Sequence, residues 1–249
     1  LEIDLAQLFV VLGEAAQDRS TAIAIIIDEM QYLNDEELGS LIMAVHKINQ
    51  KSLPLIVIGA GLPQLLGKAG NAKSYAERLF DYPEVGPLDV EDAKIALQGP
   101  MEAQGESFSN EALDKILNVT ERYPYFIQEW GYQAWKLAEK SPITVDIIEK
   151  ATEVAIKRLD KNFFLVRFDR LTPKEREYLR AMAEFGPGPL QSGDIADLMG
   201  QKVQTCAPVR NSLIKKGMIY SPAHGKTEFT VPLFVDFMKR TMEFDKKIQ

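Results

Sequence analysis

The chain has 249 residues, a net charge of −7 and a sequence pI near 5.1. Apolar residues make up 46% and charged residues 26%, as in ordinary globular proteins, and no apolar run reaches the roughly 20 residues needed to span a bilayer. These values exclude a membrane-spanning protein and argue against indiscriminate binding to polyanions. A chain of this length is expected to form more than one small domain.

The charge and the rare residues restrict the chemistry further. From Arg170 onward, thirteen Lys and Arg residues face nine Asp and Glu, a local charge of +4 against −11 for the remainder. The single cysteine, Cys206, cannot form an internal disulfide, which predicts a reducing, cytoplasmic location and a thiol that fills the core. The only histidines, His46 and His224, are far apart, so we expect neither a zinc site nor a histidine-dependent nucleophile.

The first part of the chain predicts a strand, a helix and a second strand. Residues 1–16 are typical of an amphipathic helix without a signal pattern, and with no initiator Met the chain is expected to be part of a longer one. The isoleucine-rich run 22–27 predicts a central strand covered on both faces. Asn34 and Glu37 form a capping box at a helix start, and the run 53–58 predicts the second strand. This spacing favours a parallel βαβ unit.

The next part of the chain predicts helices only. A short helix is expected near residues 74–80, and the strand signal then disappears. Helix N-terminal signals follow at Asp89, Ser109, Pro124 and Thr144. The helix that Thr144 caps is expected to continue to about Phe168.

The last part combines short helices with a hairpin. Thr172 and Glu175 form a second capping box, with proline between them at the first helical position. A short helix over 192–199 and a third that ends near Lys216 follow. Residues 218–220 and 228–231 flank a turn and predict a hairpin, which completes the element order of a winged helix.

The strongest motif is Ile25-Ile26-Ile27-Asp28-Glu29, which resembles the Walker B motif of AAA+ ATPases. A carboxylate at the end of a buried strand can hold Mg²⁺, and the next carboxylate can polarise the attacking water. The resemblance implies that Asp28 is the magnesium ligand and Glu29 the catalytic base, both at the nucleotide. An apolar strand followed by two acids also occurs by chance in α/β proteins, so the context of the motif matters.

That context covers nearly the whole chain. Four further features follow in the order seen in bacterial and archaeal initiator-like, STAND-related AAA+ ATPases: Gly59-Ala60-Gly61-Leu62-Pro63-Gln64, Tyr75-Ala76-Glu77-Arg78-Leu79, Tyr123-Pro124-Tyr125-Phe126 and the winged-helix tail. The resemblance implies an α/β P-loop core, present in part with a parallel sheet, then an α-helical lid and a C-terminal winged helix. The corresponding domains are 1–88, 89–169 and 170–249. It also implies ATP and Mg²⁺ as cofactors.

Arg78 stands where arginine fingers occur in that family. A guanidinium from a neighbouring subunit could there stabilise charge that develops on the γ-phosphate, which would imply a homo-oligomer. The alternative is a solvated arginine that pairs with Glu77 or Asp81.

Tyr123-Pro124 resembles the Gly-x-Pro element with which related ATPases contact nucleotide from the lid. Glu121 and Arg122 stand where glycine is expected, so Arg122 could contact phosphate instead. The alternative is that Pro124 only begins a helix, in which Tyr125, Phe126 and Trp130 are core aromatics.

Two parts of an ATPase site are not found. No Walker A loop is present, because neither Gly59-Ala60-Gly61 nor Gly67-Lys68-Ala69 has the required Gly-Lys-Ser/Thr pattern. The polar sensor expected after the second strand is missing or replaced by Gln64. The chain alone is therefore expected to bind ATP weakly or not at all, and hydrolysis is expected only in the full-length protein.

The third helix of the tail is the candidate DNA-recognition helix. The candidate contacts are Lys202, Gln204, Thr205, Arg210 and Asn211, with Lys226 on the wing. The modest charge of this region and Pro208 in the helix leave a protein-binding role open. The sequence thus predicts part of an ATP-binding, ATP-hydrolysing switch that couples nucleotide state to a winged helix. The alternatives are a DNA-binding regulator or an interaction scaffold with a vestigial ATPase core.

Overall fold

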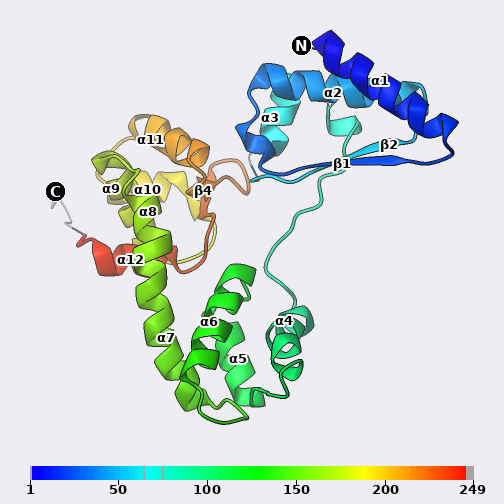
Figure 1. Ribbon diagram of the computed structural model, residues 1–249. Helices are drawn as coiled ribbons and strands as arrows, with labels where there is room; N and C mark the ends of the chain where they lie inside the picture. Colours follow the sequence, from blue (N-terminus) through cyan, green and yellow to red (C-terminus); the bar gives the residue numbers. More distant parts are fainter. Residues whose placement is uncertain (1, 64, 74–75, 245–249) are drawn as a thin grey trace. The chain divides into compact units, whose positions relative to one another are not determined.

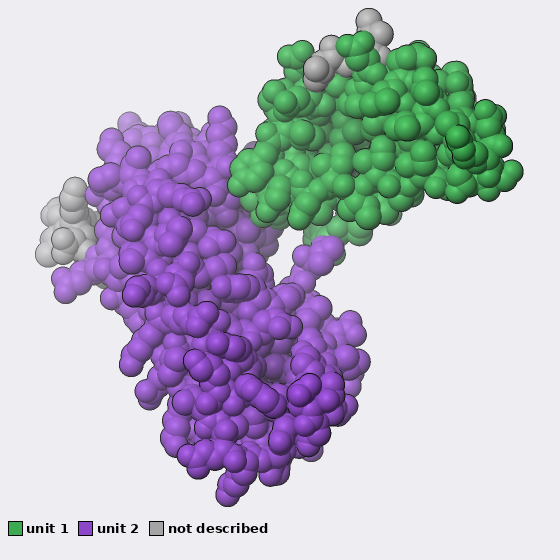
Figure 2. All heavy atoms as spheres, viewed as in Figure 1, with its two compact units in different colours: residues 1–84 green, residues 85–249 purple. Residues whose placement is uncertain are grey.

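The computed structural model describes residues 2–63, 65–73 and 76–244, and the chain divides into two compact units, residues 1–84 and 85–249 (Figure 2). In these described residues, no helix combines the length and apolarity that crossing a bilayer requires. The elements of the first unit are α1 (Glu2–Asp18), β1 (Ile23–Ile27), the 3-10 turn η1 (Met30–Tyr32), α2 (Asp35–Gln50), β2 (Leu55–Gly59), α3 (Leu65–Ala72) and η2 (Ala76–Arg78) (Figure 1).

The first unit contains the predicted parallel βαβ arrangement. β1 pairs with β2 in parallel, with Ile23 opposite Leu55 and Ile27 opposite Gly59. α1 and α2 pack on this sheet, and their apolar residues form the core of the unit. α2 begins at the predicted capping box, in which Asn34 Oδ1 accepts from the Glu37 amide at 2.9 Å and Glu37 Oε2 accepts from the Asn34 amide at 2.8 Å.

The prediction that both faces of β1 are covered is wrong. Ile26 on β1 is 76% exposed, and Ile56 and Ile58 on β2 are 58% and 50% exposed. Successive side chains of a strand point to opposite faces, and burial alternates along β1 accordingly. Among the described elements, helices therefore cover one face of the sheet, and the apolar residues of the other face remain exposed.

The second unit is mainly helical. Its elements are α4 (Val90–Glu102), α5 (Asn110–Val119), α6 (Pro124–Leu137), α7 (Val145–Leu159), the π-helical turn η3 (Asp160–Phe164), α8 (Leu165–Phe168), α9 (Pro173–Glu184), β3 (Leu190–Gln191), α10 (Ser192–Leu198), α11 (Val203–Lys215), β4 (Ile219–Tyr220), β5 (Lys226–Phe229) and α12 (Phe234–Thr241). α7, η3 and α8 follow without a break, as expected for a helix that continues to about Phe168.

Aromatic side chains join the helices of the second unit in one core. The ring of Phe164 lies 6.0 Å from that of Phe126, 5.6 Å from that of Phe234 and 5.2 Å from that of Phe237. The prediction of core aromatics is confirmed for Phe126 and Trp130, which are fully buried, and is wrong for Tyr125, which is 50% exposed. Because this core runs from α4 to α12, the domain boundary expected at 169/170 stays a prediction.

The helix starts follow the predicted signals, with one difference. Asp89 and Ser109 accept from the Asp92 and Ala112 amides at 2.8 and 3.2 Å. The Thr172–Glu175 capping box is also formed. Thr144 occupies the N-cap of α7, but its hydroxyl donates to Asp146 Oδ1 and accepts from no amide of the first turn.

The C-terminal part of the second unit contains the predicted antiparallel hairpin. Ile219 of β4 lies opposite Phe229 of β5. Two further elements were not predicted: β3, which pairs with the other edge of β5, and α12. β3 has only two residues, and α12 begins after Leu233, which has a positive φ of 61° and provides no capping side chain.

Candidate functional site

Asp28 and Glu29 lie at the carboxyl end of β1, next to the segment that follows β2. The Ala60 amide donates to the Ile27 carbonyl at 2.8 Å, and the Met30 amide donates to the Ala60 carbonyl at 2.9 Å. These two bonds extend the contact between the strands beyond the sheet. Both carboxylates are exposed, as required of groups that would bind a ligand at a strand end.

The backbone turns sharply at Glu29. This residue has φ 56° and ψ 38°, the left-handed region that non-glycine residues rarely adopt, and its amide donates to Asp28 Oδ1 at 2.8 Å. The turn ends β1 and begins η1. It also places the side chains of Glu29 and Gln31 within reach of each other.

The Asp28 carboxylate fits a Mg²⁺ ion that takes most of its ligands from water and phosphate oxygens. Mg²⁺ in nucleotide sites usually keeps several waters and takes one or two carboxylates together with phosphate oxygens, and Asp28 offers one exposed carboxylate. Over residues 2–63, 65–73 and 76–244, no cluster of three His, Cys, Asp or Glu could hold a metal without such additional ligands.

Gln31, which the sequence analysis did not select, connects three parts of the site. Its side-chain amide donates to Glu29 Oε2, and its Oε1 accepts from the Leu62 amide at 3.1 Å. Its backbone carbonyl accepts from Lys68 Nζ at 3.1 Å, and the same ammonium donates to the Leu33 carbonyl. One side chain therefore joins the end of β1 to the segment after β2, while α3 holds the backbone of η1.

Gly59 at the end of β2 and Gly61 just after it make room for this arrangement. A Cβ atom at Gly59 would lie 2.0 Å from Met30 Sδ, and one at Gly61 would lie 2.9 Å from Gln31 Oε1. Side chains from η1 thus fill the space in which a polar sensor side chain was expected. Gln64, the expected replacement for that sensor, lies outside the described residues.

Arg78, the expected arginine finger, is the last residue of η2 and is exposed. Asp81, one of its alternative ion-pair partners, is also exposed. Exposure is compatible with contact to a neighbouring subunit and with simple solvation, so both interpretations of Arg78 stay open.

In the second unit, Pro124 is the exposed first residue of α6. The two residues that stand in place of the expected glycine, Glu121 and Arg122, have positive φ angles of 50° and 57°, the conformation that glycine adopts most readily. Arg122 Nε donates to the Leu88 carbonyl at 2.9 Å, so its guanidinium is partly engaged within the protein. Burial raises the pKa of Glu121, and the nearby charge of Asp236 raises it further.

The candidate DNA contacts on α11 do not behave alike. Lys202, Gln204 and Thr205 are exposed at the start of α11, and Asn211 is exposed in its second half. Arg210 instead donates to Thr227 Oγ1 and Ser221 Oγ, both at 2.8 Å, and to the Lys226 carbonyl at 2.9 Å. Arg210 therefore attaches the hairpin to α11. Pro208 lies inside α11 without ending it.

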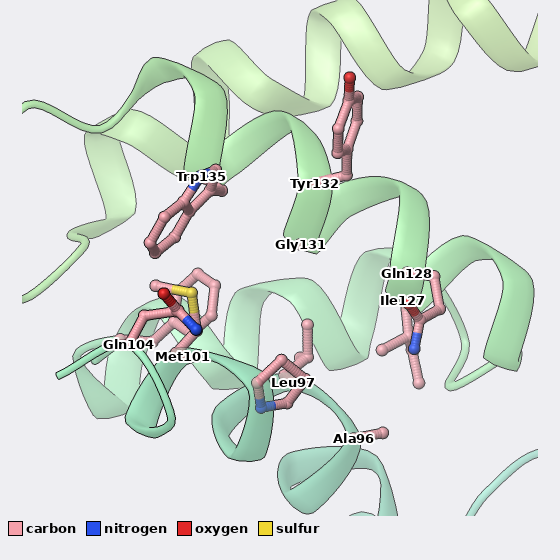
Figure 3. Close-up of a pocket in the computed structure, with 11 residues that line it drawn as sticks. Ala96, Leu97, Met101, Gln104, Ile127, Gln128, Gly131, Tyr132 and Trp135 are labelled. Atoms are coloured by element: carbon pink, nitrogen blue, oxygen red, sulfur yellow. The ribbon is translucent and has the colours of Figure 1, made fainter. Parts of the chain in front are cut away.

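A separate apolar hollow of about 300 Å³ lies between α4 and α6 (Figure 3). Its walls are Ala96, Leu97, Pro100, Met101, Gln104, Phe108, Ile127, Gln128, Gly131, Tyr132 and Trp135. At Gly131, a Cβ atom would lie 3.1 Å from Leu97 Cδ2, so the glycine allows α4 and α6 to approach. No charged side chain lines the hollow, which makes it unsuitable for a triphosphate.

Comparisons with known proteins bear on the fold. A family model described as a domain of unknown function (DUF8462) matches residues 161–238, less than half of the chain. No curated protein matches the sequence. Among solved structures, a Walker-type ATPase of Pyrococcus abyssi is 14% identical, with a TM-score of 0.64 over 94% of this chain and 67% of that one.

A Holliday junction branch migration motor of Thermotoga maritima, RuvB, is 18% identical, with a TM-score of 0.45 over 82% of this chain and 66% of that one. The chain thus spans about two thirds of the length of these structures. The comparison with the Pyrococcus abyssi structure shows the fold alone: this chain resembles that Walker-type ATPase and is mostly helical, with a small parallel sheet of β1 and β2.

Proposed function

We propose that this chain is part of an ATP-binding and ATP-hydrolysing AAA+ switch of the initiator-like type, in which nucleotide state moves a C-terminal winged helix. Asp28 is the ligand of Mg²⁺ in the Walker B motif, and Glu29 is the base that polarises the attacking water. Arg78 acts in trans on the γ-phosphate of a neighbouring subunit. Pro124, at the start of a lid helix, contacts the nucleotide.

One observation carries this proposal. Asp28 and Glu29 are exposed at the carboxyl end of a parallel strand, in a chain whose fold resembles that of a Walker-type ATPase. The carboxyl ends of parallel strands are where α/β proteins bind ligands. Mg²⁺, when bound there, neutralises charge on the phosphates, while the protein supplies the carboxylates that orient the metal and the water.

The test is ATP turnover by the natural protein that contains this chain. Glu29→Gln removes the base and keeps the shape of the side chain, so kcat should fall about 10²- to 10⁴-fold with ATP binding retained. Glu36→Gln, at an exposed position in the first turn of α2, makes the same charge change and should leave turnover unaltered. Equal turnover in wild type and Glu29→Gln would reject Glu29 as the base.

Action of Arg78 in trans is tested by mixing inactive subunits. Arg78→Ala and Glu29→Gln proteins should each be inactive and should regain part of the activity when combined, because some interfaces then contain an intact base and an intact arginine. A mixture that stays inactive over a range of ratios would favour the solvated arginine.

Contact of the winged helix with DNA is a second candidate, favoured by the exposed polar residues at the start of α11. The intact protein should bind mixed-sequence duplex DNA in a salt-dependent manner. Lys202→Ala should lower the salt slope by about 1, whereas Lys239→Ala on α12 should not. If the intact protein shows no binding, the winged helix serves a protein partner instead.

A further inference from the structure

We infer that Gln31 is a positioning residue that orients Glu29 and couples it to the segment after β2. The inference rests on the proposed function, because it concerns how the proposed base is held. Gln31 acts through the Glu29 carboxylate.

The geometry gives Gln31 two partners at once. Its amide NH₂ donates to Glu29 Oε2 and its carbonyl Oε1 accepts from the Leu62 amide at 3.1 Å. On a regular helix, residues two apart do not face each other. On a regular strand they share a face but lie roughly 6.6 Å apart along the chain. Here the left-handed backbone at Glu29 (φ 56°) brings the two side chains together.

The chemistry of the amide matches both contacts. A glutamine offers two N–H donors and one carbonyl acceptor, so it can satisfy a carboxylate on one side and a backbone amide on the other. Binding one oxygen of Glu29 restricts the rotation of the carboxylate and leaves the other oxygen for water. A glutamate at position 31 could accept from Leu62 but could not donate to Glu29, and a methionine could do neither.

The surrounding structure holds Gln31 in place. Lys68 Nζ donates to its backbone carbonyl, and Gly61 leaves the space that Oε1 occupies. A displacement of the segment after β2 is therefore transmitted to Glu29 through a single side chain. In its described residues 60–63 this segment carries no polar sensor residue of its own, and Gln31 of η1, which follows β1, supplies the connection.

The first experiment measures ATP turnover by the natural protein with Gln31→Glu and Gln31→Met. Both variants should lower kcat at least about tenfold, the scale of a lost orienting contact, while KM for ATP changes less than about twofold. In the Glu29→Gln background the same substitutions should cause little further loss, because residues that act as one unit are not additive. Gln17→Glu, an exposed change on α1, is the control.

A merely structural role would give a different pattern. The inference would be overturned, with the proposed function intact, by either of two results. One is a loss of kcat in Gln31→Glu and Gln31→Met that adds fully to the loss caused by Glu29→Gln. The other is a wild-type kcat in both Gln31 variants. Absence of turnover in the wild-type protein would overturn the proposed function instead. Gly61→Ala, which crowds Oε1 without altering Gln31, should lower kcat in the same direction and guards against a variant that fails to fold.

The second experiment uses amide hydrogen exchange at Leu62 and does not depend on turnover. Exchange should accelerate in Gln31→Met, which lacks the acceptor, and should remain near the wild-type rate in Gln31→Glu, which keeps it. Equal exchange in wild type and Gln31→Met would show that the contact with Leu62 is not formed and would overturn the coupling.

Discussion

Charged side chains serve different purposes in the two units. At the end of β1, the carboxylates of Asp28 and Glu29 are exposed, and their hydrogen bonds reach no farther than Gln31. In the second unit, Glu175 is 3% exposed and joins α9 to α11. The difference separates carboxylates that are available to a ligand from those that stabilise the fold.

Glu175 shows how a buried carboxylate is stabilised. Burial alone disfavours its charge, but Lys216 Nζ and Ser212 Oγ donate to it, each at 2.7 Å, and so does the Thr172 amide. These bonds outweigh the burial and lower the pKa of Glu175 to about 2 from 4.5. Its charged form is thus part of the folded structure.

The largest effect should come from the core of the second unit. Trp130 is fully buried on α6 and its Nε1 donates to Thr152 Oγ1 at 2.8 Å, so Trp130→Ala should cost about 3–5 kcal/mol of unfolding free energy. Trp135 lies on the same helix and is 44% exposed. Trp135→Ala is therefore the matched control and should lower the free energy of unfolding by less than half as much. Urea unfolding followed by circular dichroism measures both, and similar losses would contradict the assigned core.

A smaller, pH-dependent effect is expected at Glu175. Because its pKa is lowered on folding to about 2, its charge stabilises the protein above pH 4.5, and this contribution is lost as the pH falls from 4.5 towards 2. Glu175→Gln should cost on the order of 3 kcal/mol at pH 7, and the difference from wild type should shrink over that range. Glu177→Gln, at an exposed position on the same helix, should follow wild type; a constant difference at all pH values would argue against the ion pair.

The smallest effect should occur at Asp28. Asp28→Asn retains the Oδ1 atom that accepts from the Glu29 amide and removes an exposed charge, so stability should change by no more than about 0.5 kcal/mol. Thermal unfolding without nucleotide measures this change. A large loss would mean that Asp28, like Glu175, serves the fold, and the comparison between the two units would fail.

Much of the fold could be predicted because its local signals agree with its packing. The capping boxes at Asn34 and Thr172 begin helices in the structure, and the spacing of the first two strands gave the parallel pair. Exposure of one sheet face could not be predicted, because an isoleucine run has the same appearance whether one or both faces are covered. α12 could have been found from Phe234, Val235, Phe237 and Met238, which follow a helical spacing.

The candidate site could be predicted only in part. Asp28 and Glu29 were found because a strand end followed by acids is a recognisable pattern. Gln31 was not, because its contacts depend on the left-handed turn at Glu29 and on Leu62, and neither leaves a signal in a single sequence. The internal role of Arg210 was missed for the same reason, since Thr227 and Ser221 approach it only in the folded chain.

The unbroken helix from α7 through η3 to α8 has a mechanical consequence. At 1.5 Å per residue, residues 145–168 extend about 35 Å, and Arg240 and the ring of Phe237 hold the region of η3 to α12. A helix of this length acts as a lever arm: a tilt of about 5° at one end displaces the other by about 3 Å. A small rotation near Val145 is therefore magnified by distance along this helix.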